Sequence, residues 1–301
     1  MAPKAARAAV LEGSATAEIS LIAVTFFWGS TFTLVQTAIQ DASTLAFLAA
    51  RFSLGAVLLA VLYRLRRLRS HPHSWKPGLA AGLCLWAGYY LQTTGLRYTT
   101  PSKSAFLTSL CVVMVPLLAA IVYKIVPARA ETAGAILAVA GTALMAAGDR
   151  LSAINAGDVL TVGAALAFAA HILVLGYYAP RIGFESLSVW QIAVVAAGSA
   201  LTCGWAEPFE WRWSRPLLFA IAFTGVFCTA LAFTVQAWAQ GRTSPARTAL
   251  IFALEPVFAA ATSWAVAGER LPARAVAGAG LILAGVLAAE LKPERSKRHP
   301  V

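Results

Sequence analysis

Long apolar runs, separated by short polar connections, make up most of the 301-residue chain. A helix needs about 20 apolar residues to cross the hydrocarbon core of a bilayer. Ten runs approach or reach this length, so the pattern predicts an all-α polytopic membrane protein with ten transmembrane helices. The predicted spans are Ile19–Ala38, Thr44–Tyr63, Gly78–Leu96, Ser104–Ile125, Thr132–Ala147, Val159–Tyr178, Ser186–Cys203, Leu217–Trp238, Arg247–Val266 and Ala275–Glu290.

The composition agrees with a membrane location. Hydrophobic residues make up 59% of the chain and charged residues 12%, whereas a soluble domain has about 25% charged residues. The net charge of +11 would suggest nucleic-acid binding in a soluble protein. Here the Lys and Arg residues lie between the apolar runs, which favours contact with anionic membrane lipid. We therefore expect a lipid environment and no nucleic-acid partner.

No pattern in the sequence indicates an enzyme, a metal site or a cofactor site. The chain has neither a phosphate-binding Gly-x-x-x-x-Gly-Lys loop nor a His-Glu-x-x-His zinc motif. Its cysteines lie singly inside apolar runs and are best interpreted as small buried hydrophobes. They are Cys84, Cys111, Cys203 and Cys228. We expect a protein without cofactors that is not an enzyme.

One segment occurs twice. Residues 100–110 read Thr-Pro-Ser-Lys-Ser-Ala-Phe-Leu-Thr-Ser-Leu, and residues 244–254 read Ser-Pro-Ala-Arg-Thr-Ala-Leu-Ile-Phe-Ala-Leu. The same shift of 144 residues carries Gly134 onto Gly278 and Gly141 onto Gly285. Such self-similarity at a fixed period indicates two related halves. Each half contains five predicted spans, an odd number, so the second half must enter the membrane in the opposite orientation.

An inverted-topology repeat is typical of secondary transporters, in which a central site between the halves is exposed to alternate sides. A channel or an inert scaffold is the alternative interpretation. The predicted organisation is a cytoplasmic segment 1–18, a first five-helix repeat 19–148, a second repeat 156–291 and a basic cytoplasmic tail 292–301. Sixteen of the 24 Lys and Arg residues would then share one side with both termini, which predicts that both termini are cytoplasmic in an inner (plasma) membrane.

Several short motifs in a fixed order carry a family resemblance. They read Phe-Trp-Gly-Ser from residue 27, Ala-Arg-Phe from residue 50, Gly-Leu-Arg-Tyr-Thr-Thr from residue 95, Ser-Ala-Phe-Leu from residue 104, Leu-Glu-Pro-Val-Phe from residue 254 and Gly-Glu from residue 268. The chain resembles the EamA-like members of the drug/metabolite transporter superfamily. Within them it is most similar to the YddG-type exporters of aromatic and other amino acids. The first half departs from the second, because Cys111 and Val112 stand where the second half has Glu255 and Pro256.

Ionisable residues within predicted spans are costly and are candidates for function. Glu255 lies near the middle of the ninth span, where it could bind a substrate amine, carry a proton or play a structural role. His171 lies in the middle of the sixth span and could bind substrate, relay a proton or tie two helices together. For Arg51 in the second span we favour a structural role over contact with a substrate carboxylate.

Aromatic and amide side chains in the middle of spans suit a weakly polar cavity for amphipathic molecules. For any one aromatic residue, ordinary packing is the alternative. We expect the cavity to involve spans one, three, four, six, eight and nine. Glu255 and His171 complete the candidate substrate-binding set, which is Trp28, Tyr89, Tyr90, Gln92, His171, Tyr178, Gln236, Trp238 and Glu255.

Proline and glycine residues suggest where helices bend or approach closely. Pro116 and Pro256 are candidate gating hinges, because a proline within a helix removes a hydrogen bond. Glycines in spans five and ten are spaced for close helix contact, either with each other or in a dimer.

These features together predict a secondary transporter that exports small amphipathic metabolites, among them amino acids and aromatic ones, by alternating access. Export of other metabolites or drugs is the alternative within the same superfamily, and a channel is the alternative outside it. A single chain is expected to be sufficient for transport.

Overall fold

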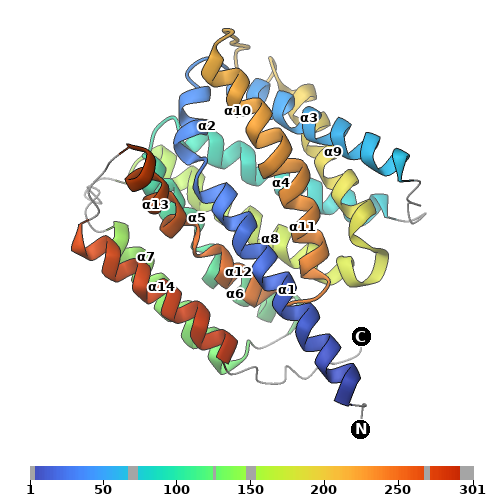
Figure 1. The fold of residues 1–301 in the computed structure, drawn as a ribbon. Helices are drawn as coiled ribbons and strands as arrows, with labels where there is room; N and C mark the ends of the chain where they lie inside the picture. The colour runs from blue at the N-terminus through green and yellow to red at the C-terminus, as the bar shows by residue number, and fades with distance from the viewer. Residues whose placement is uncertain (1–3, 67–73, 125–126, 147–153, 268–271, 292–301) are drawn as a thin grey trace.

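The computed structural model describes residues 4–66, 74–124, 127–146, 154–267 and 272–291. Within these ranges the protein is helical, and an antiparallel bridge joins Ala42 to Trp211 (Figure 1). The Gly268-Glu269 pair and the basic tail 292–301 lie outside the described residues. The elements are α1 Lys4–Gly29, α2 Phe32–Ala38, α3 Thr44–Leu65, α4 Trp75–Gly95, α5 Pro101–Thr108, α6 Cys111–Tyr123, α7 Arg129–Ala146, α8 Ala156–Ile182, α9 Phe184–Thr202, α10 Arg215–Gly225, the π-helix η1 Val226–Leu231, α11 Ala232–Gln240, α12 Pro245–Phe252, α13 Glu255–Ala267 and α14 Ala273–Leu291.

Seven helical stretches in the described part are long and apolar enough to cross a membrane. A shorter apolar helix covers Ala273–Ala289. A chain with this many such helices is a multi-pass membrane protein. The seven stretches are Ala15–Ala38, Thr44–Leu65, Pro101–Tyr123, Ala156–Ile182, Phe184–Thr202, Arg215–Gln240 and Pro245–Ala265.

Four of the predicted spans are not continuous α-helices. The first is divided into α1 and α2, the fourth into α5 and α6, and the ninth into α12 and α13. The eighth contains the π-helical segment η1 between α10 and α11. Discontinuous helices are typical of transporter cores, because a broken backbone frees polar groups that can face a cavity.

The breaks obey the 144-residue repeat. Helix α5 begins at Pro101 and ends at Thr108, and α12 begins at Pro245 and ends at Phe252. After each break the next half-helix begins at the equivalent position, Cys111 in α6 and Glu255 in α13. Both short helices start with proline, and a threonine or serine side chain caps each of them. The repeated sequence therefore folds into the same broken helix twice.

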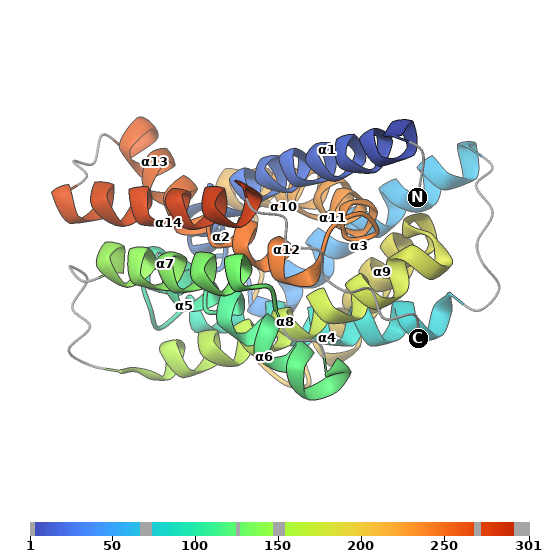
Figure 2. The same cartoon turned by 90° about the horizontal axis from the view of Figure 1, so that it is seen from below.

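Helices α7 and α14 pack side by side along their lengths (Figures 1 and 2). A Cβ atom on Gly134 would lie 2.6 Å from the carbonyl oxygen of Gly285, and one on Gly141 would lie 2.4 Å from that of Gly278. Only glycine permits backbones to approach so closely. The pairing also shows that the two helices are antiparallel. The predicted contact between spans five and ten is thus confirmed within one chain.

Candidate functional site

A cavity lies in the middle of the helix bundle, and the broken helices form much of its wall. Its lining comes from the six predicted spans, namely α1–α2, α4, α5–α6, α8, α11 and α12–α13, and also from α3 through Arg51. The cavity volume is about 80 Å³, well below the roughly 300–1,000 Å³ of typical ligand pockets. The cavity must therefore widen before it can hold a metabolite.

Aromatic rings cover one wall of this cavity. The Trp28 ring packs edge-on to Phe252 at 5.1 Å between centroids and lies 5.2 Å from Phe233. Tyr89 packs edge-on to Phe168 at 5.3 Å and to Phe233 at 6.0 Å. These five rings come from five separate helices, α1, α4, α8, α11 and α12, and form a continuous apolar surface. Such a surface can hold an aliphatic or aromatic part of a ligand.

Arg51 is the cation of the cavity. It is 3% exposed, and its Nε donates a hydrogen bond of 2.9 Å to Thr229 Oγ1. Its Nη2 donates to the Tyr89 hydroxyl at 3.3 Å and to the Cys228 carbonyl at 3.4 Å. The guanidinium also lies 4.7 Å from the centre of the Tyr89 ring. Arg51 is thus held in place by neutral groups, which orient the charge without neutralising it.

Glu255 supplies the carboxyl group of the cavity and begins α13 directly after the break. The residue is 9% exposed. Among the described residues, its carboxylate has no hydrogen-bond or ion-pair partner, and it makes no salt bridge with Arg51. The two side chains therefore form no charge pair in this structure. One small cavity thus contains a buried guanidinium and a buried carboxylate that are not paired with each other.

Two further polar side chains have fixed orientations at the cavity. Gln236 Nε2 donates to Gln240 Oε1 at 3.0 Å, and Gln240 Nε2 donates to the Ile172 carbonyl at 2.8 Å. This relay leaves the buried Gln236 Oε1 without a partner, so it is an acceptor available to a ligand. His171 Nε2 lies 2.7 Å from Gln191 Oε1, which ties α8 to α9 while the ring still lines the cavity.

Six of the candidate residues predicted from sequence line the cavity: Trp28, Tyr89, Gln92, His171, Gln236 and Glu255. The other three are not among its lining residues. Tyr90 stacks on Trp86 at 5.9 Å, Tyr178 packs against Tyr177 at 4.8 Å, and Trp238 carries the guanidinium of Arg242 over its ring. Arg51, for which the sequence favoured a structural role, lines the cavity and also supports Tyr89.

The two candidate hinge prolines have different positions in the helices. Pro116 lies inside α6, as expected. Pro256 does not interrupt a continuous helix, because α12 has already ended and α13 begins at Glu255. The break therefore precedes this proline, which occupies the first turn of a helix, where its missing N–H leaves no intrahelical bond unmade.

Two carboxylates outside the cavity were missed by the sequence interpretation. Asp158 lies 2.5 Å from the Lys103 ammonium, and Glu18 lies 3.0 Å from the Arg247 guanidinium. Both acids are less than a tenth exposed. The available signal was their position, because each lies within the first turn of a long apolar helical stretch. Within the described ranges, no three His, Cys, Asp or Glu side chains are grouped as a metal site requires.

Comparison with known proteins identifies the family. The EamA-like transporter family matches two consecutive segments, residues 15–147 and 155–289. An uncharacterized transporter of Archaeoglobus fulgidus is 32% identical over 277 residues, which cover 92% of this chain and 86% of that protein. The uncharacterized transporter YvbV of Bacillus subtilis is 27% identical over 285 residues, 90% of each chain. A crystal structure with 19% sequence identity has a TM-score of 0.75 and covers 92% of this chain and 97% of its own, which shows a shared fold.

The family match covers nearly all of the described helices, including the four discontinuous spans and the residues that line the cavity. The relatives that match over most of their length are also transporters. The protein therefore belongs to the EamA-like transporter family of the drug/metabolite transporter superfamily and is a multi-pass membrane transporter.

Proposed function

We propose that this transporter exports small amphipathic metabolites, chiefly amino acids including aromatic ones, across the inner membrane by alternating access. The observation that carries the proposal is that one aromatic cavity contains the Arg51 guanidinium and the Glu255 carboxyl group, which are not paired with each other. Burial of an isolated charge within a membrane protein is costly unless a partner compensates it. A zwitterionic ligand would compensate both charges at once.

The Arg51 and Glu255 side chains define how an amino acid would lie in the cavity. Its carboxylate would face the Arg51 guanidinium, where planar donors suit a carboxylate. Its ammonium group would face Glu255, with the fixed acceptor Gln236 Oε1 as a second candidate partner. The side chain would lie against the Trp28 and Tyr89 rings. The site thus requires an amphipathic molecule with opposite charges at one end.

Alternating access is supported by the antiparallel pairing of α7 and α14. These helices are equivalent under the 144-residue repeat, yet Gly134 contacts Gly285 and Gly141 contacts Gly278. Antiparallel packing of equivalent helices is what two inverted halves would produce. The ten-span arrangement with both termini in the cytoplasm is part of the same proposal, as is the sufficiency of a single chain.

The test is transport by purified protein in liposomes. The panel contains phenylalanine and leucine, the corresponding amines without the carboxylate, the corresponding acids without the ammonium group, and unrelated neutral metabolites. Each compound is measured with and without a proton gradient and in counterflow. We expect the amino acids to be transported and to compete with each other. Each single-charge analogue should be transported at least about tenfold more slowly, because either Arg51 or Glu255 would lack its ligand partner.

Arg51→Gln tests the role of Arg51 separately from that of Glu255. We expect this variant to lose most amino-acid transport while keeping its residual rate with the amines, since these lack the group that Arg51 would bind. The matched control is Arg97→Gln, because Arg97 bonds to the Ala42 carbonyl and Thr44 hydroxyl and does not line the cavity. Preference for a compound without either charge would refute the amino-acid assignment and favour another metabolite. Saturation with counterflow would exclude a channel, and their absence would exclude alternating access.

A further inference from the structure

The repeated segment contains a five-residue motif whose side chains grip a carboxylate. Residues 99–103 read Thr-Thr-Pro-Ser-Lys, and residues 243–247 read Thr-Ser-Pro-Ala-Arg. In both copies the second residue caps the short helix by accepting a hydrogen bond from the backbone N–H of the fifth residue. In both copies the first residue of the motif is a threonine and the fifth is a cation.

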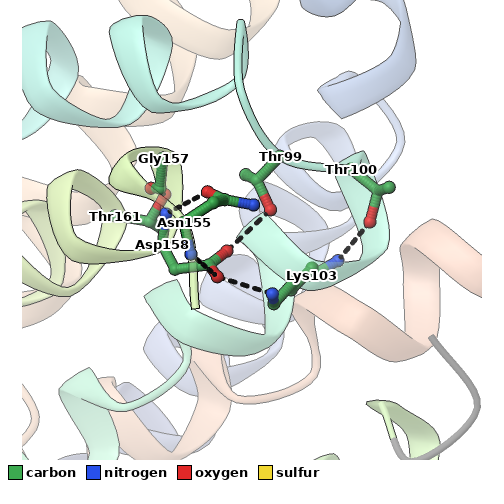
Figure 3. Close-up of polar contacts among 7 residues, drawn as sticks. All are labelled: Thr99, Thr100, Lys103, Asn155, Gly157, Asp158 and Thr161. Atoms are coloured by element: carbon green, nitrogen blue, oxygen red, sulfur yellow. Dashed lines mark hydrogen bonds and ion pairs between the residues drawn. The ribbon is translucent and has the colours of Figure 1, made fainter. Parts of the chain in front are cut away.

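In the first copy the carboxylate belongs to Asp158 at the start of α8 (Figure 3). Lys103 Nζ lies 2.5 Å from Asp158 Oδ2, and the Thr99 hydroxyl donates to Asp158 Oδ1 at 2.8 Å. The Asn155 backbone N–H also donates to Oδ2 at 3.0 Å, and Asn155 Oδ1 accepts from the Asp158 backbone N–H at the same distance. We refer to Thr99, Lys103 and Asp158 as the first clamp.

In the second copy the carboxylate belongs to Glu18 in α1. Arg247 Nη1 lies 3.0 Å from Glu18 Oε1, and the Thr243 hydroxyl lies 3.2 Å from the same oxygen. The threonine and the cation of the motif therefore again bind one carboxylate, through a single oxygen here and through both oxygens in the first copy. We refer to Thr243, Arg247 and Glu18 as the second clamp.

Each clamp joins one family-matched segment to the other. The motif of the first segment, 15–147, grips Asp158 of the second segment, 155–289, and the motif of the second grips Glu18 of the first. The clamps also lie at opposite ends of the bundle. Glu18 lies near the beginning of the first span, whereas Gln36 near its end donates to the Thr99 carbonyl at 3.1 Å. Glu18 and Gln36 are 18 positions apart, which corresponds to about 27 Å of helix. This length is close to the roughly 30 Å of the hydrocarbon core.

A short helix connects each clamp to the cavity. Helix α5 carries Lys103 in its first turn and ends at Thr108, which lines the cavity. Helix α12 carries Arg247 in its first turn and ends at Phe252, which also lines it. Lys103 and Thr108 are five positions apart, as are Arg247 and Phe252, which corresponds to about 7.5 Å of helix. Because a break follows each short helix, α5 and α12 can tilt without moving the whole span.

We propose that the two clamps are the gates of the transporter, one for each face of the membrane. Opening of the Lys103–Asp158 clamp would let α5 move away from α8 and expose the cavity at one face. Opening of the Arg247–Glu18 clamp would let α12 move away from α1 and expose the cavity at the other face. Both clamps are closed in this structure, in agreement with a cavity too small for a metabolite. The clamp residues are positioning residues, since they do not line the cavity.

The proposal rests on the alternating access proposed above, but its test needs no substrate. Cys111 lines the cavity and reports access to it. Right-side-out and inside-out membrane vesicles are treated with a membrane-impermeant maleimide, and labelled Cys111 is quantified by peptide mass spectrometry. We expect Asp158→Asn to raise the labelling rate from one face only and Glu18→Gln to raise it from the opposite face only. Each increase should be about tenfold or more, because loss of one partner destabilises a buried pair strongly.

Matched variants separate gating from general loosening. Glu185→Gln removes a carboxylate from the first turn of α9 that takes part in neither clamp, and it should change labelling from neither face. Thr99→Val and Thr243→Val remove one hydrogen bond from each clamp and should give the same face pattern with smaller increases. These threonine variants test the same proposal if an acid variant fails to fold. Thermal unfolding and gel filtration show whether each variant is folded.

Labelling from the same face in both acid variants, or unchanged labelling in folded protein, would overturn the gate assignment. Face-specific labelling without amino-acid transport would keep the gates and refute the substrate class. Amino-acid transport without face-specific labelling would keep the substrate class and refute the gates. The two proposals therefore fail separately.

Discussion

The two broken helices α5–α6 and α12–α13 agree in geometry and differ in chemistry. Both begin with a capped proline turn, break after eight residues and resume at equivalent positions. At the resumption point the first copy has Cys111, whose thiol donates to the Ala165 carbonyl at 3.0 Å. The second copy has Glu255, whose carboxylate has no partner among the described residues.

The two copies therefore share their geometry, and at the equivalent position only the second copy has a carboxyl group at the cavity. The thiol already has a hydrogen-bond partner, whereas the unpartnered carboxyl group remains available to a ligand. A substrate between the halves would therefore meet two walls of similar shape and different polarity. The predictions that follow test how far this asymmetry extends.

The largest effect should come from Glu255. Glu255→Gln is expected to lower amino-acid transport by about thirtyfold or more, because a contact with a buried charge is worth about 2 kcal/mol or more. Cys111→Ala, the equivalent change in the first copy, should stay within about twofold. Both rates are measured in liposomes at equal protein content. Equal losses in the two variants would show that the copies share the chemistry.

Glycine packing between α7 and α14 should be the next most sensitive feature. Gly278→Ala would place a methyl group 2.4 Å from the Gly141 carbonyl oxygen, a backbone atom that cannot turn aside. Overpacking of this kind costs about 1–3 kcal/mol, so the midpoint of thermal unfolding in detergent should fall. Gly280→Ala is the control, since no atom lies within 4 Å of its Cβ position. An unchanged midpoint for Gly278→Ala would argue against close helix contact.

The helix caps should show the smallest and most graded difference. Thr100→Ala removes one cap and should cost about 1 kcal/mol of stability. Ser244→Ala removes the equivalent cap and also a 2.8 Å bond to Glu131, so it should cost about 2 kcal/mol. Thermal unfolding measures both, with the exposed Ser102→Ala as the neutral reference. A larger loss for Thr100→Ala would reverse the expected asymmetry.

The membrane class, the repeat and the six predicted cavity spans followed from the sequence, because hydrophobic length and self-similarity are local properties of the chain. The helix faces were harder to predict. In the eighth span an ideal helix would put Phe227 and Trp238 toward the cavity, but η1 contains π-helical turns with more residues than an α-helical turn. From this span the cavity is lined by Gln236, which is in the candidate set, and by Phe233, which is not, while Phe227 is 38% exposed.

The breaks and the clamps could not be located from sequence for a different reason. The residues between α5 and α6 are Ser109 and Leu110, with neither glycine nor proline to mark an interruption. The clamps join residues 55 and 229 positions apart, so no short pattern contains both partners. Only the fold brings such partners together.

The second clamp also has a consequence for how the protein is made. Arg247 follows Glu18 by 229 residues, so at about 5–20 residues per second the ribosome supplies it roughly ten to fifty seconds later. During that interval the acid at the start of the nascent chain has no Arg247 to bind. Asp158 follows Lys103 by only 55 residues, so the partners of the first clamp are synthesised closer together in time. The residues of the first clamp are therefore all synthesised well before those of the second clamp are complete.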